Sequence, residues 1–308
     1  MHLRTLNDLS RDDIEAILDR SVDLKARFRN GQREPILAGR SLALLFEKPS
    51  LRTRVSFASA MTHLGGGSTY LTTKEAGLHG REELCDVARV LGGMSDAIAM
   101  RTFSQQLIED FAAHSSCPVI NALSDERHPC QALTDVLTLT EHFDDLSSCR
   151  LVYIGDGNNI ARSLATATAI LGIPLAICTP PDYALDDATL ADLRQRHPSA
   201  FIDISTDPTM AVKDADVIYT DVWASMGQEG EADGRRKVFA PYQVNTALMA
   251  KAPSGCLFMH DMPAHRGEEV TGDVFDSPQC IAFQQAENRM HLAKGLLAWL
   301  LLEAIELV

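Results

Sequence analysis

The sequence has no long hydrophobic run: no apolar segment approaches the ~20 residues that a membrane-spanning helix needs. Residues 1–13 also lack the apolar core of a signal peptide, so we expect a cytoplasmic protein. Positive charge is scarce, because Lys+Arg number 28 and Asp+Glu 42, which gives a net charge of −14. A nucleic-acid-binding protein needs a basic face for the phosphates, so we expect neither a membrane nor a nucleic-acid partner. Any anion site must be built locally, from arginines.

Paired cysteines are missing as well. The seven cysteines are an odd number and include no Cys-x-x-Cys pair. Scattered thiols of this kind are typical of a reduced cytosolic protein and argue against a disulfide framework or a zinc site. They are Cys85, Cys117, Cys130, Cys149, Cys178, Cys256 and Cys280.

The length of 308 residues allows two domains of ordinary size. In the first half, short apolar runs bounded by polar residues predict buried strands. These runs are Ser41–Phe46, 68–72, Ala97–Arg101 and 118–123. Apolar residues three or four apart predict helices at 11–28 (capped by Ser10), from Ser50 to about Gly65, at 82–91 and at 133–143.

The pattern restarts after the short polar stretch 144–149, which we expect to be the domain junction. Strands are predicted at 150–154, Leu175–Cys178, 216–220 and Leu257–His260, and helices at 161–171, 188–196 and 286–308. Strands and helices that alternate twice over predict an α/β fold with two doubly wound parallel-sheet domains. Ligand sites in such sheets lie beyond the carboxyl ends of the strands.

One stretch, residues 46–57, reads Phe-Glu-Lys-Pro-Ser-Leu-Arg-Thr-Arg-Val-Ser-Phe. Pro49 ends the expected strand, and a helix should begin after Ser50. Its first turn offers free backbone N–H groups, a positive dipole end, hydroxyl groups and guanidinium groups, which together suit a dianionic phosphate. The side chains concerned are Ser50, Arg52, Thr53 and Arg54. The alternative is the charged start of an ordinary surface helix.

This stretch resembles the Ser-x-Arg-Thr-Arg carbamoyl-phosphate loop of the aspartate and ornithine carbamoyltransferases. A second motif, His128-Pro129-Cys130-Gln131, resembles the family's His-Pro-x-Gln. There the His polarises the carbonyl of the carbamoyl group and the Gln bonds its amide. A donor aimed at a carbonyl under attack lowers the barrier. Arg101 matches a family arginine that contacts carbamoyl phosphate.

The Gly-Asp-Gly-Asn-Asn sequence at 155–159 could be mistaken for a dinucleotide-binding loop. It lacks the full Gly-x-Gly-x-x-Gly spacing, and no acidic residue ends the next predicted strand, at Cys178. It resembles instead a Gly-Asp-x-Asn-Asn stretch of the ornithine branch, in which the second Asn, here Asn159, holds the amino acid. An ordinary strand-to-helix turn is the alternative.

The sequence Asp-Val-Trp-Ala-Ser-Met-Gly at 221–227 matches the ornithine branch and not the aspartate branch. A carboxylate can take an ammonium group, and a glycine-containing loop can close over a substrate to exclude water. The resemblance implies that Asp221, Ser225 and Met226 bind the amino acid.

The segment after the last predicted strand departs from the family. The family has His-Cys-Leu-Pro where this chain has His260-Asp261-Met262-Pro263. An aspartate, with a reference pKa of about 3.9, is a weaker base than a cysteine at about 8.5, and it carries a negative charge. We expect Asp261 to orient the substrate's ammonium group or to accept its proton. The alternative is that Asp261 only binds loop amides.

The remaining matches complete the implied site. Arg289, in Glu287-Asn288-Arg289, matches a family arginine that reaches carbamoyl phosphate. The resemblance assigns catalysis to Arg52, His128 and Asp261. It assigns carbamoyl-phosphate binding to Ser50, Leu51, Arg52, Thr53, Arg101, His128, Gln131, Met262 and Arg289, and amino-acid binding to Asn159, Asp221, Ser225 and Met226.

A second departure lies at 77–81, Gly-Leu-His-Gly-Arg. The family commonly has Gln or His before a Leu-Gly or Ile-Gly pair there, and it contributes this loop to a neighbouring subunit's site. His79 or Arg81 could substitute. The resemblance implies a homotrimer or a multiple of trimers.

The resemblance covers nearly the whole chain. It implies a carbamoyl-phosphate-binding domain at 1–143, with the helix 286–308 packed back on it, an amino-acid-binding domain at 144–285, and an active site in the cleft between them. The implied reaction is carbamoyl transfer to the δ-amine of L-ornithine, without metal or organic cofactor. Two alternatives remain open: transfer to another amine, such as a diamine, lysine or modified ornithine, and a non-catalytic regulatory or binding paralogue.

Overall fold

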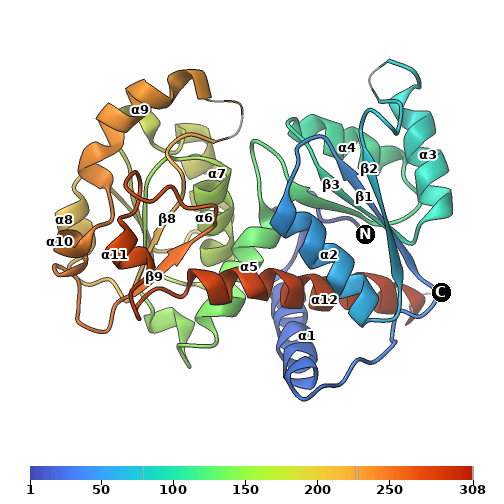
Figure 1. Ribbon diagram of the computed structural model, residues 1–308, viewed down its shortest axis with the longest axis horizontal. Helices are drawn as coiled ribbons and strands as arrows, with labels where there is room; N and C mark the ends of the chain where they lie inside the picture. The colour runs from blue at the N-terminus through green and yellow to red at the C-terminus, as the bar shows by residue number, and fades with distance from the viewer. Residues whose placement is uncertain (79, 226, 228, 307–308) are drawn as a thin grey trace. The chain divides into compact units, whose positions relative to one another are not determined.

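The computed structural model describes residues 1–78, 80–225, 227 and 229–306. The chain forms two compact units (Figure 1). Unit 1 comprises Met1–Leu137 and Glu287–Val308, and unit 2 comprises Thr138–Ala286. Each unit has its own sheet of parallel strands flanked by helices, so the predicted fold class of two α/β domains is confirmed. No helix in the described part of the chain is both long and apolar enough to cross a membrane.

Unit 1 contains a four-stranded parallel sheet in the order β2-β1-β3-β4. Its strands are β1 (Ser41–Phe46), β2 (Gly67–Thr72), β3 (Ala97–Arg101) and β4 (Val119–Leu123). Its helices are α1 (Arg11–Arg29), α2 (Leu51–His63), α3 (Leu84–Met94), α4 (Gln105–His114), most of α5 (Pro129–Leu139) and most of α12 (Ala282–Glu306). Ala43 and Leu45 of β1 and Ile98 and Met100 of β3 pack with α3 and α4 on one face. Alternate residues along a strand point to opposite faces, which is why these pairs are two apart.

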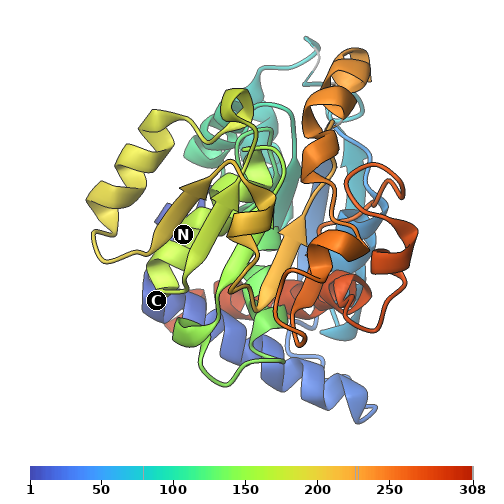
Figure 2. The ribbon, with the colours of Figure 1, turned by 90° about the vertical axis from the view of Figure 1, so that its left-hand side faces the viewer.

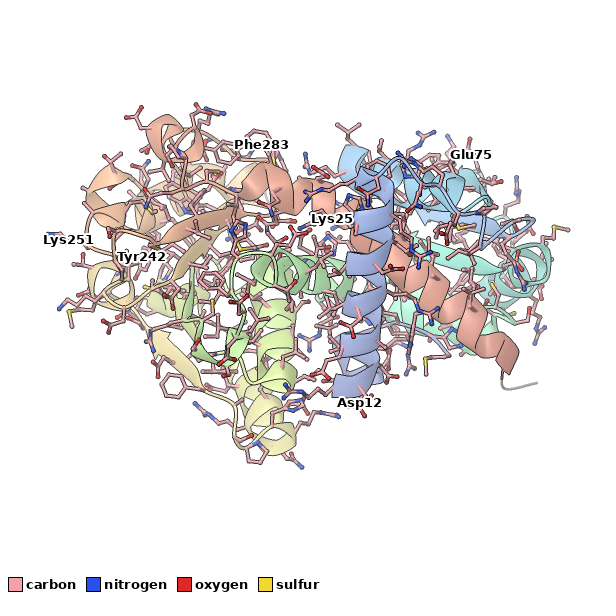
Figure 3. The ribbon with its side chains drawn as sticks, turned by 90° about the horizontal axis from the view of Figure 1, so that it is seen from below. Asp12, Lys25, Glu75, Tyr242, Lys251 and Phe283 are labelled. Carbon is pink, nitrogen blue, oxygen red and sulfur yellow. The ribbon has the colours of Figure 1, made fainter. Side chains whose placement is uncertain are left out.

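The part of α12 in unit 1 packs directly on α1 (Figure 3). Lys25 Nζ on α1 donates to Asn288 Oδ1 on α12 at 2.5 Å. Where α12 lies against α1, a Cβ on Gly295 would lie 2.7 Å from the carbonyl oxygen of Ile17. Glycine at this position therefore allows the two backbones to approach this closely.

Unit 2 contains a five-stranded parallel sheet in the order β7-β6-β5-β8-β9, seen from its own side in Figure 2. Its strands are β5 (Leu151–Ile154), β6 (Leu175–Cys178), β7 (Ile202–Ser205), β8 (Val217–Thr220) and β9 (Leu257–His260). Its helices include α6 (Asn159–Leu171), α7 (Asp187–Arg196), α8 (Pro208–Ala211), α9 (Ala232–Phe239), α10 (Thr246–Met249) and α11 (Gly272–Phe275).

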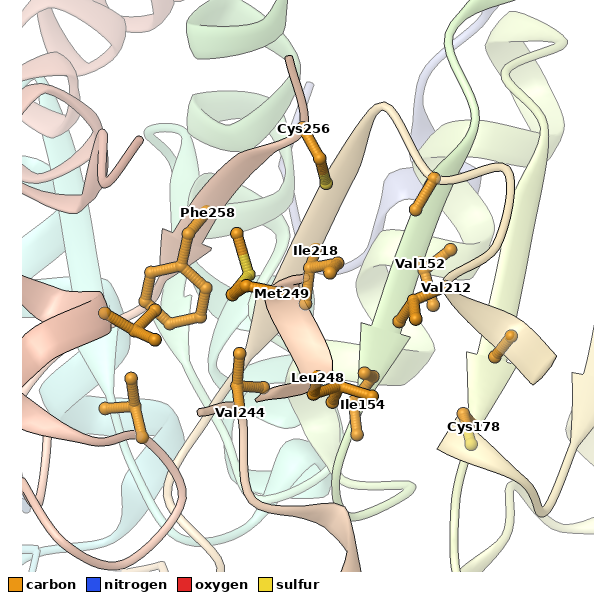
Figure 4. Packing of buried hydrophobic residues seen from close by; sticks show 14 of the residues in the cluster. Val152, Ile154, Cys178, Val212, Ile218, Val244, Leu248, Met249, Cys256 and Phe258 are labelled. Atoms are coloured by element: carbon orange, nitrogen blue, oxygen red, sulfur yellow. The ribbon is translucent and has the colours of Figure 1, made fainter. Parts of the chain in front are cut away.

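The sheet of unit 2 is buried on both faces. On one face, Val152 of β5, Ile218 of β8 and Phe258 of β9 pack with α10 and α11 (Figure 4). On the other, Tyr153 and Tyr219 pack with α6 and α7, and their rings meet edge to face with centroids 5.7 Å apart. Burial on both sides explains why these strands read as continuous apolar runs in the sequence.

Strand order determines where each unit can bind a ligand. In unit 1 the order reverses between β1 and β3, and in unit 2 it reverses between β5 and β8. Ligands of doubly wound sheets bind beyond the carboxyl ends of the strands at such a reversal. The loops that begin there contain residues 47–50 and 102–104 in unit 1 and residues 155–158 and 221–225 in unit 2. All four lie in or beside the sequence motifs.

Several predicted bounds differ from the structure. The helix predicted at 133–143 is α5, which begins at Pro129 and ends at Leu139. Proline is tolerated at the first position of a helix because its missing N–H has no partner there. The carbonyl of His128 accepts from the N–H groups of Gln131 and Ala132, which fixes this earlier start. Elements absent from the prediction are β7, the α-helices α4, α8, α9, α10 and α11, and the short 3₁₀ helices.

Candidate active site

The start of α2 carries the first group of predicted residues. Ser50 is its N-cap: its Oγ accepts from the N–H of Thr53 at 3.2 Å and donates to Thr53 Oγ1 at 3.0 Å. Leu51 is exposed, and Arg52 is half-buried in the first turn. Free backbone N–H groups and the positive end of the helix dipole at such a turn favour an anion. Arg54 points elsewhere, because its guanidinium lies 3.8 Å from the ring centroid of Tyr70.

Thr53 joins two buried arginines from distant parts of the chain. Arg101 Nη1, at the end of β3, donates to Thr53 Oγ1 at 3.4 Å. Arg289 Nη2, on α12, donates to the same oxygen at 3.0 Å. Only 7% of Arg101 and 8% of Arg289 is exposed to solvent. Two guanidinium groups that converge on one neutral hydroxyl concentrate positive charge next to the α2 N-terminus, within an otherwise acidic chain.

Gln131 extends this network along α5. Arg289 Nη1 donates to Gln131 Oε1 at 2.7 Å, and Gln131 Nε2 donates to Asp135 Oδ1 at 2.8 Å. These contacts orient the Gln131 amide, with its oxygen facing the arginine. Asp135 was not predicted, although its spacing of four residues from Gln131 on one helix was a usable signal.

His128 is 1% exposed and lies just before α5. Burial, followed by the positive charges of Arg289 and Arg101, lowers the pKa of His128 well below its ordinary value. The imidazole is therefore neutral near neutral pH, and it still has one N–H with which to donate to a carbonyl oxygen.

In unit 2, the turn at 155–158 joins β5 to α6. Gly157 donates its N–H to the carbonyl of Tyr183 at 2.8 Å, and a Cβ there would lie 2.6 Å from backbone atoms of Ala184 and Leu185. This glycine is needed for packing against the 183–185 segment, so it does not indicate a dinucleotide site. Asn159, the predicted amino-acid ligand, occupies the first position of α6 and is half-buried.

Asn158 is the N-cap of α6 and was not predicted as functional. Its Oδ1 accepts from the N–H groups of Ile160 and Ala161 at 2.9 and 3.2 Å. Its Nδ2 donates to Asp221 Oδ2 at 2.9 Å, just beyond β8. A single side chain thereby ties the carboxyl end of β8 to the start of α6, and it holds Asp221 in place.

Asp221 is 5% exposed. Burial, followed by the negative charge of Asp261, raises the pKa of Asp221 well above its ordinary value. Asp221 and Asp261 follow β8 and β9 directly, and the register pairs Thr220 with His260. The structure thus brings these two predicted residues to one edge of the sheet, and Asp261 is half-buried there.

The loop that starts at Asp221 is braced by α9. Arg235 Nη1 donates to the carbonyl of Trp223 at 2.9 Å and to Asp156 Oδ2 at 2.7 Å. The Trp223 ring is buried and lies 6.0 Å from the Phe239 ring. Ser225, a predicted ligand, is half-buried in this loop. Met226 lies outside the described residues.

Beyond β9, His260 orders the segment that contains Asp261 and Met262. The N–H of Met262 donates to His260 Nδ1 at 2.8 Å, so Nε2 carries the proton and donates to Glu269 Oε1 at 3.0 Å. Both His260 and Glu269 are buried. Met262 has φ +62°, a left-handed conformation that is uncommon for a residue other than glycine and clusters at functional sites.

One further cluster of side chains bears on metal binding. His265, Glu268 and Glu269 offer ligand atoms within 4.8 Å of one another. Glu268 already accepts from Arg236 at 3.0 Å, and Glu269 accepts from His260. We therefore interpret these three side chains as a structural cluster and not as a metal site.

The loop at 77–81 holds the two residues proposed as substitutes in a neighbouring subunit's site. Arg81 Nη2 donates to Glu82 Oε1 at 3.0 Å and to the carbonyl of Glu75 at 3.1 Å within its own chain. His79 lies outside the described residues.

Comparison with known proteins agrees with this arrangement. The family described as "Aspartate/ornithine carbamoyltransferase" matches twice: its carbamoyl-P binding domain at residues 1–141 and its Asp/Orn binding domain at 147–300. The ornithine carbamoyltransferase of Anoxybacillus flavithermus is 47% identical over 96% of this chain and 95% of its own. The anabolic ornithine carbamoyltransferase of Pyrococcus furiosus is 46% identical over 96% of this chain and 95% of its own. A solved structure of ornithine carbamoyltransferase from Pyrococcus furiosus superimposes with a TM-score of 0.94 at 45% identity, over 97% of this chain and 96% of that one. The chain belongs to the aspartate/ornithine carbamoyltransferase family.

Proposed function

We propose that this protein transfers the carbamoyl group of carbamoyl phosphate to the δ-amine of L-ornithine and yields citrulline and phosphate. The support is threefold: the family, the names of the similar proteins, and the Asp-x-x-x-Ser-Met-Gly loop of the ornithine branch at 221–227. Residues 1–143 with 286–308 would bind carbamoyl phosphate, and residues 144–285 would bind the amino acid.

The observation that carries the proposal is the convergence of Arg101 and Arg289 on Thr53 at the start of α2. Buried guanidinium groups, a helix N-terminus and a hydroxyl suit the phosphoryl group of carbamoyl phosphate. Ser50, Leu51 and Arg52 would complete this phosphate site from the same turn.

The carbamoyl end would lie against His128 and Gln131. A neutral His128 donates to the carbonyl oxygen, on which negative charge develops as the amine attacks. Gln131 Oε1, already oriented by Arg289, accepts from the carbamoyl amide. Met262 would contribute to this end from its left-handed turn. Orientation and charge stabilisation are enough for this chemistry, so we propose no metal or organic cofactor.

The amino acid would be held by Asn159, Asp221, Ser225 and Met226. Asp221 is kept in place by Asn158, and the loop that carries Ser225 is anchored through Trp223 by Arg235. A loop braced at one end can still close over a bound substrate and exclude water.

The test is a carbamoylation assay of the purified protein. Carbamoyl phosphate is supplied with L-ornithine, L-lysine or a diamine, and the ureido product and released phosphate are both measured. We expect citrulline with L-ornithine and at least a hundredfold less product with the other amines. Absence of any ureido product at high enzyme concentration would rule out the transferase activity.

One observation favours a second candidate. The resemblance leads us to expect cysteine at position 261, where this chain has Asp261, so transfer to another amine is the alternative. A product formed faster from lysine or a diamine than from ornithine would support it. A non-catalytic paralogue is less well supported, because such a protein has no need of Arg52, His128 and Asp221 together.

We also propose a cytoplasmic homotrimer, or a multiple of trimers, that works in arginine biosynthesis. The stretch 77–81 departs from the family's sequence but occupies the position from which the family reaches into a neighbouring subunit's site, and this position supports the trimer. The anabolic name of the Pyrococcus furiosus relative supports the biosynthetic direction. Seven free cysteines suit a reducing compartment. Light scattering tests the assembly, and a fully active monomer of 33.7 kDa would contradict it.

A further inference from the structure

A buried carboxyl group lies one helical turn beyond Gln131 on α5. Asp135 follows Gln131 by four residues, and residues four apart lie on the same face of a helix. Both side chains are buried: Asp135 is 0% exposed and Gln131 is 1% exposed. The neighbouring positions Leu133, Val136 and Leu137 belong to the apolar core and are fully buried. A carboxyl group in such surroundings is costly unless it makes polar contacts, so its contact with Gln131 calls for an explanation.

The two partners of the Gln131 amide determine which way it faces. Arg289 Nη1 lies 2.7 Å from its Oε1, and Asp135 Oδ1 lies 2.8 Å from its Nε2. A guanidinium can only donate and a carboxylate can only accept, so the partners require an oxygen on one side and an NH₂ group on the other. Reversing the amide would place a donor against Arg289 and an acceptor against Asp135. The chemistry of the partners therefore assigns the orientation.

An amide oxygen held in this direction can discriminate between acyl groups. A carbonyl oxygen can accept two hydrogen bonds, so Gln131 Oε1 can accept from a ligand N–H while it accepts from Arg289. Arg289 also donates to Thr53 at 3.0 Å, which places this oxygen next to the proposed phosphate site. Carbamoyl phosphate carries an NH₂ group where acetyl phosphate carries a methyl group. The methyl group would leave the buried oxygen without that second hydrogen bond, which costs binding free energy.

We propose that Asp135 is a positioning residue that sets the specificity of the site for the acyl donor. By holding Gln131 Nε2, it keeps Oε1 directed at the acyl group and thereby selects a carbamoyl group over an acetyl group. Asp135 acts through Gln131 and not on the substrate itself. The inference rests on the proposed function, because it concerns the carbamoyl-phosphate site, and it names the class of acyl phosphate that this site accepts: one whose acyl group donates an N–H.

Arg289 does not fix this orientation by itself. Without the carboxyl group at position 135, Gln131 Nε2 loses its acceptor, and a buried donor that loses its acceptor is costly. The terminal torsion of a glutamine side chain is broad, so the amide can turn toward another acceptor, and its oxygen then leaves the acyl group. Arg289 keeps its contact with Thr53 during such a turn. Loss of the carboxyl group should therefore weaken the contact with the acyl NH₂ and spare the contacts with the phosphate.

The experiment measures the binding of two stable analogues of carbamoyl phosphate by titration calorimetry. Phosphonoacetamide keeps the NH₂ group, and (2-oxopropyl)phosphonate has a methyl group in its place. We expect the unaltered protein to bind the amide at least about tenfold more tightly than the ketone, and Asp135→Ala to reduce this preference to about twofold. The affinity of Asp135→Ala for the ketone should stay within about twofold of the original. Asp135→Asn should keep most of the preference, because the asparagine oxygen still accepts from Gln131 Nε2.

Thr134→Val is the matched control. Thr134 is buried on the same helix and donates to the carbonyl of Cys130 at 2.7 Å, and its removal should leave the preference unchanged. Asp135→Val replaces the alanine variant if the smaller side chain prevents folding. A preference that survives in these variants, an equal loss of affinity for both analogues, or equal binding of both by the unaltered protein overturns the inference and leaves the proposed function standing. If the unaltered protein binds neither analogue, the carbamoyl-phosphate site is wrong, and the proposed function fails with it.

Discussion

The guanidinium of Arg289 makes two contacts that one ammonium group could not make together. Its Nη1 reaches Gln131 Oε1 at 2.7 Å, and its Nη2 reaches Thr53 Oγ1 at 3.0 Å. The planar fork fixes the distance and direction between these donors, whereas a lysine offers a single charged point on a flexible stem. Arg289 therefore positions both ends of the proposed carbamoyl-phosphate site.

We expect Arg289→Lys to raise the KM for carbamoyl phosphate by about 10- to 100-fold, which corresponds to about 1.4–2.7 kcal/mol. The lysine keeps the charge but loses one of the two directed contacts. Initial-rate kinetics at saturating ornithine measure the change. Arg54→Lys is the matched control. Arg54 belongs to the Ser-x-Arg-Thr-Arg motif, but its guanidinium stacks on the ring of Tyr70. An equal rise in the KM for carbamoyl phosphate in both variants would contradict this role for Arg289.

Asp221 illustrates a cost that function imposes on stability. Burial and the neighbouring Asp261 raise its pKa in the folded state above the unfolded value. The folded protein then holds this proton at pH values where the unfolded chain has released it, so the free energy of unfolding falls as pH rises through that window. At neutral pH the charged form is destabilising.

Asp221→Asn should therefore melt at a higher temperature than the unaltered protein at pH 7.5, by about 2 °C or more, while losing most activity. Asparagine keeps the shape, and its Oδ1 can still accept from Asn158. The stability gain should shrink as pH falls toward about 4, where the unfolded carboxyl is also protonated. Calorimetry at several pH values measures this, and a lower melting temperature at pH 7.5 would contradict it.

At the scale of elements, helices α1 and α2 both begin with a serine cap, but of these two only the start of α2 belongs to the site. Ser50 caps α2, and Ser10 caps α1 in a capping box with Asp13. Each serine oxygen satisfies a backbone donor that the helix leaves open. Ser50 also donates to Thr53 Oγ1, the hydroxyl on which Arg101 and Arg289 converge.

We expect Ser50→Ala and Ser10→Ala to lower the free energy of unfolding by similar amounts, about 1 kcal/mol each. Only Ser50→Ala should weaken carbamoyl-phosphate binding, because only that cap orients Thr53. Chemical denaturation and titration calorimetry give the two quantities separately. A loss of binding in Ser10→Ala as large as in Ser50→Ala would show that cap loss acts through general stability.

Much of the fold was predictable because most of its strands are buried, β2 and β7 being the exceptions. Strands β1, β3, β6 and β9 have the bounds predicted from their apolar runs. By contrast, β7 alternates Ile-Asp-Ile-Ser at the edge of its sheet, and its apolar run is too short to recognise. Helices α8, α10 and α11 each span four residues, about one turn, which gives no periodicity to read.

The candidate site was likewise predictable only in part. Residues in contiguous motifs were named from the sequence, and the structure joins Ser50, Thr53, Arg101 and Arg289 through hydrogen bonds. The supporting contacts of Asn158 with Asp221 and of Arg235 with Asp156 were missed. They join residues 63 and 79 positions apart. Only the order of the strands brings such residues together, and single-sequence patterns do not reveal which strands are neighbours.

At the scale of the whole molecule, the two units differ in which groups that titrate at alkaline pH have a pKa shifted by burial. In unit 2, burial raises the pKa of Cys149, Cys178 and Cys256 to about 12 and also raises that of Tyr242. In unit 1, burial raises the pKa of Cys130 to about 12 and also raises that of Cys117, but it lowers the pKa of Lys294 to about 8.

These shifts act on stability with opposite signs. A thiol with a raised folded pKa contributes stability below its unfolded pKa of about 8.5, and this stability is lost as pH rises toward 12. A lysine with a lowered folded pKa does the reverse: the free energy of unfolding rises between about pH 8 and 10.4. In unit 1 the lysine offsets part of the effect of the thiols, whereas in unit 2 the thiols act together.

We therefore expect unit 2 to lose stability before unit 1 as pH rises from 7.5 to 10. The chain has two tryptophans, Trp223 in unit 2 and Trp299 in unit 1, and both are buried. Trp299→Phe leaves a fluorescence signal from unit 2 alone, and Trp223→Phe leaves one from unit 1 alone. In denaturant titrations under reducing conditions, the Trp223 midpoint should fall between pH 7.5 and 10 by more than the Trp299 midpoint. Cys178→Ala should reduce this fall, because one of the shifted thiols is gone, whereas Cys85→Ala, at a half-buried position in unit 1, should not. A Trp299 midpoint that falls as much as the Trp223 midpoint would contradict the assignment of alkaline sensitivity to unit 2.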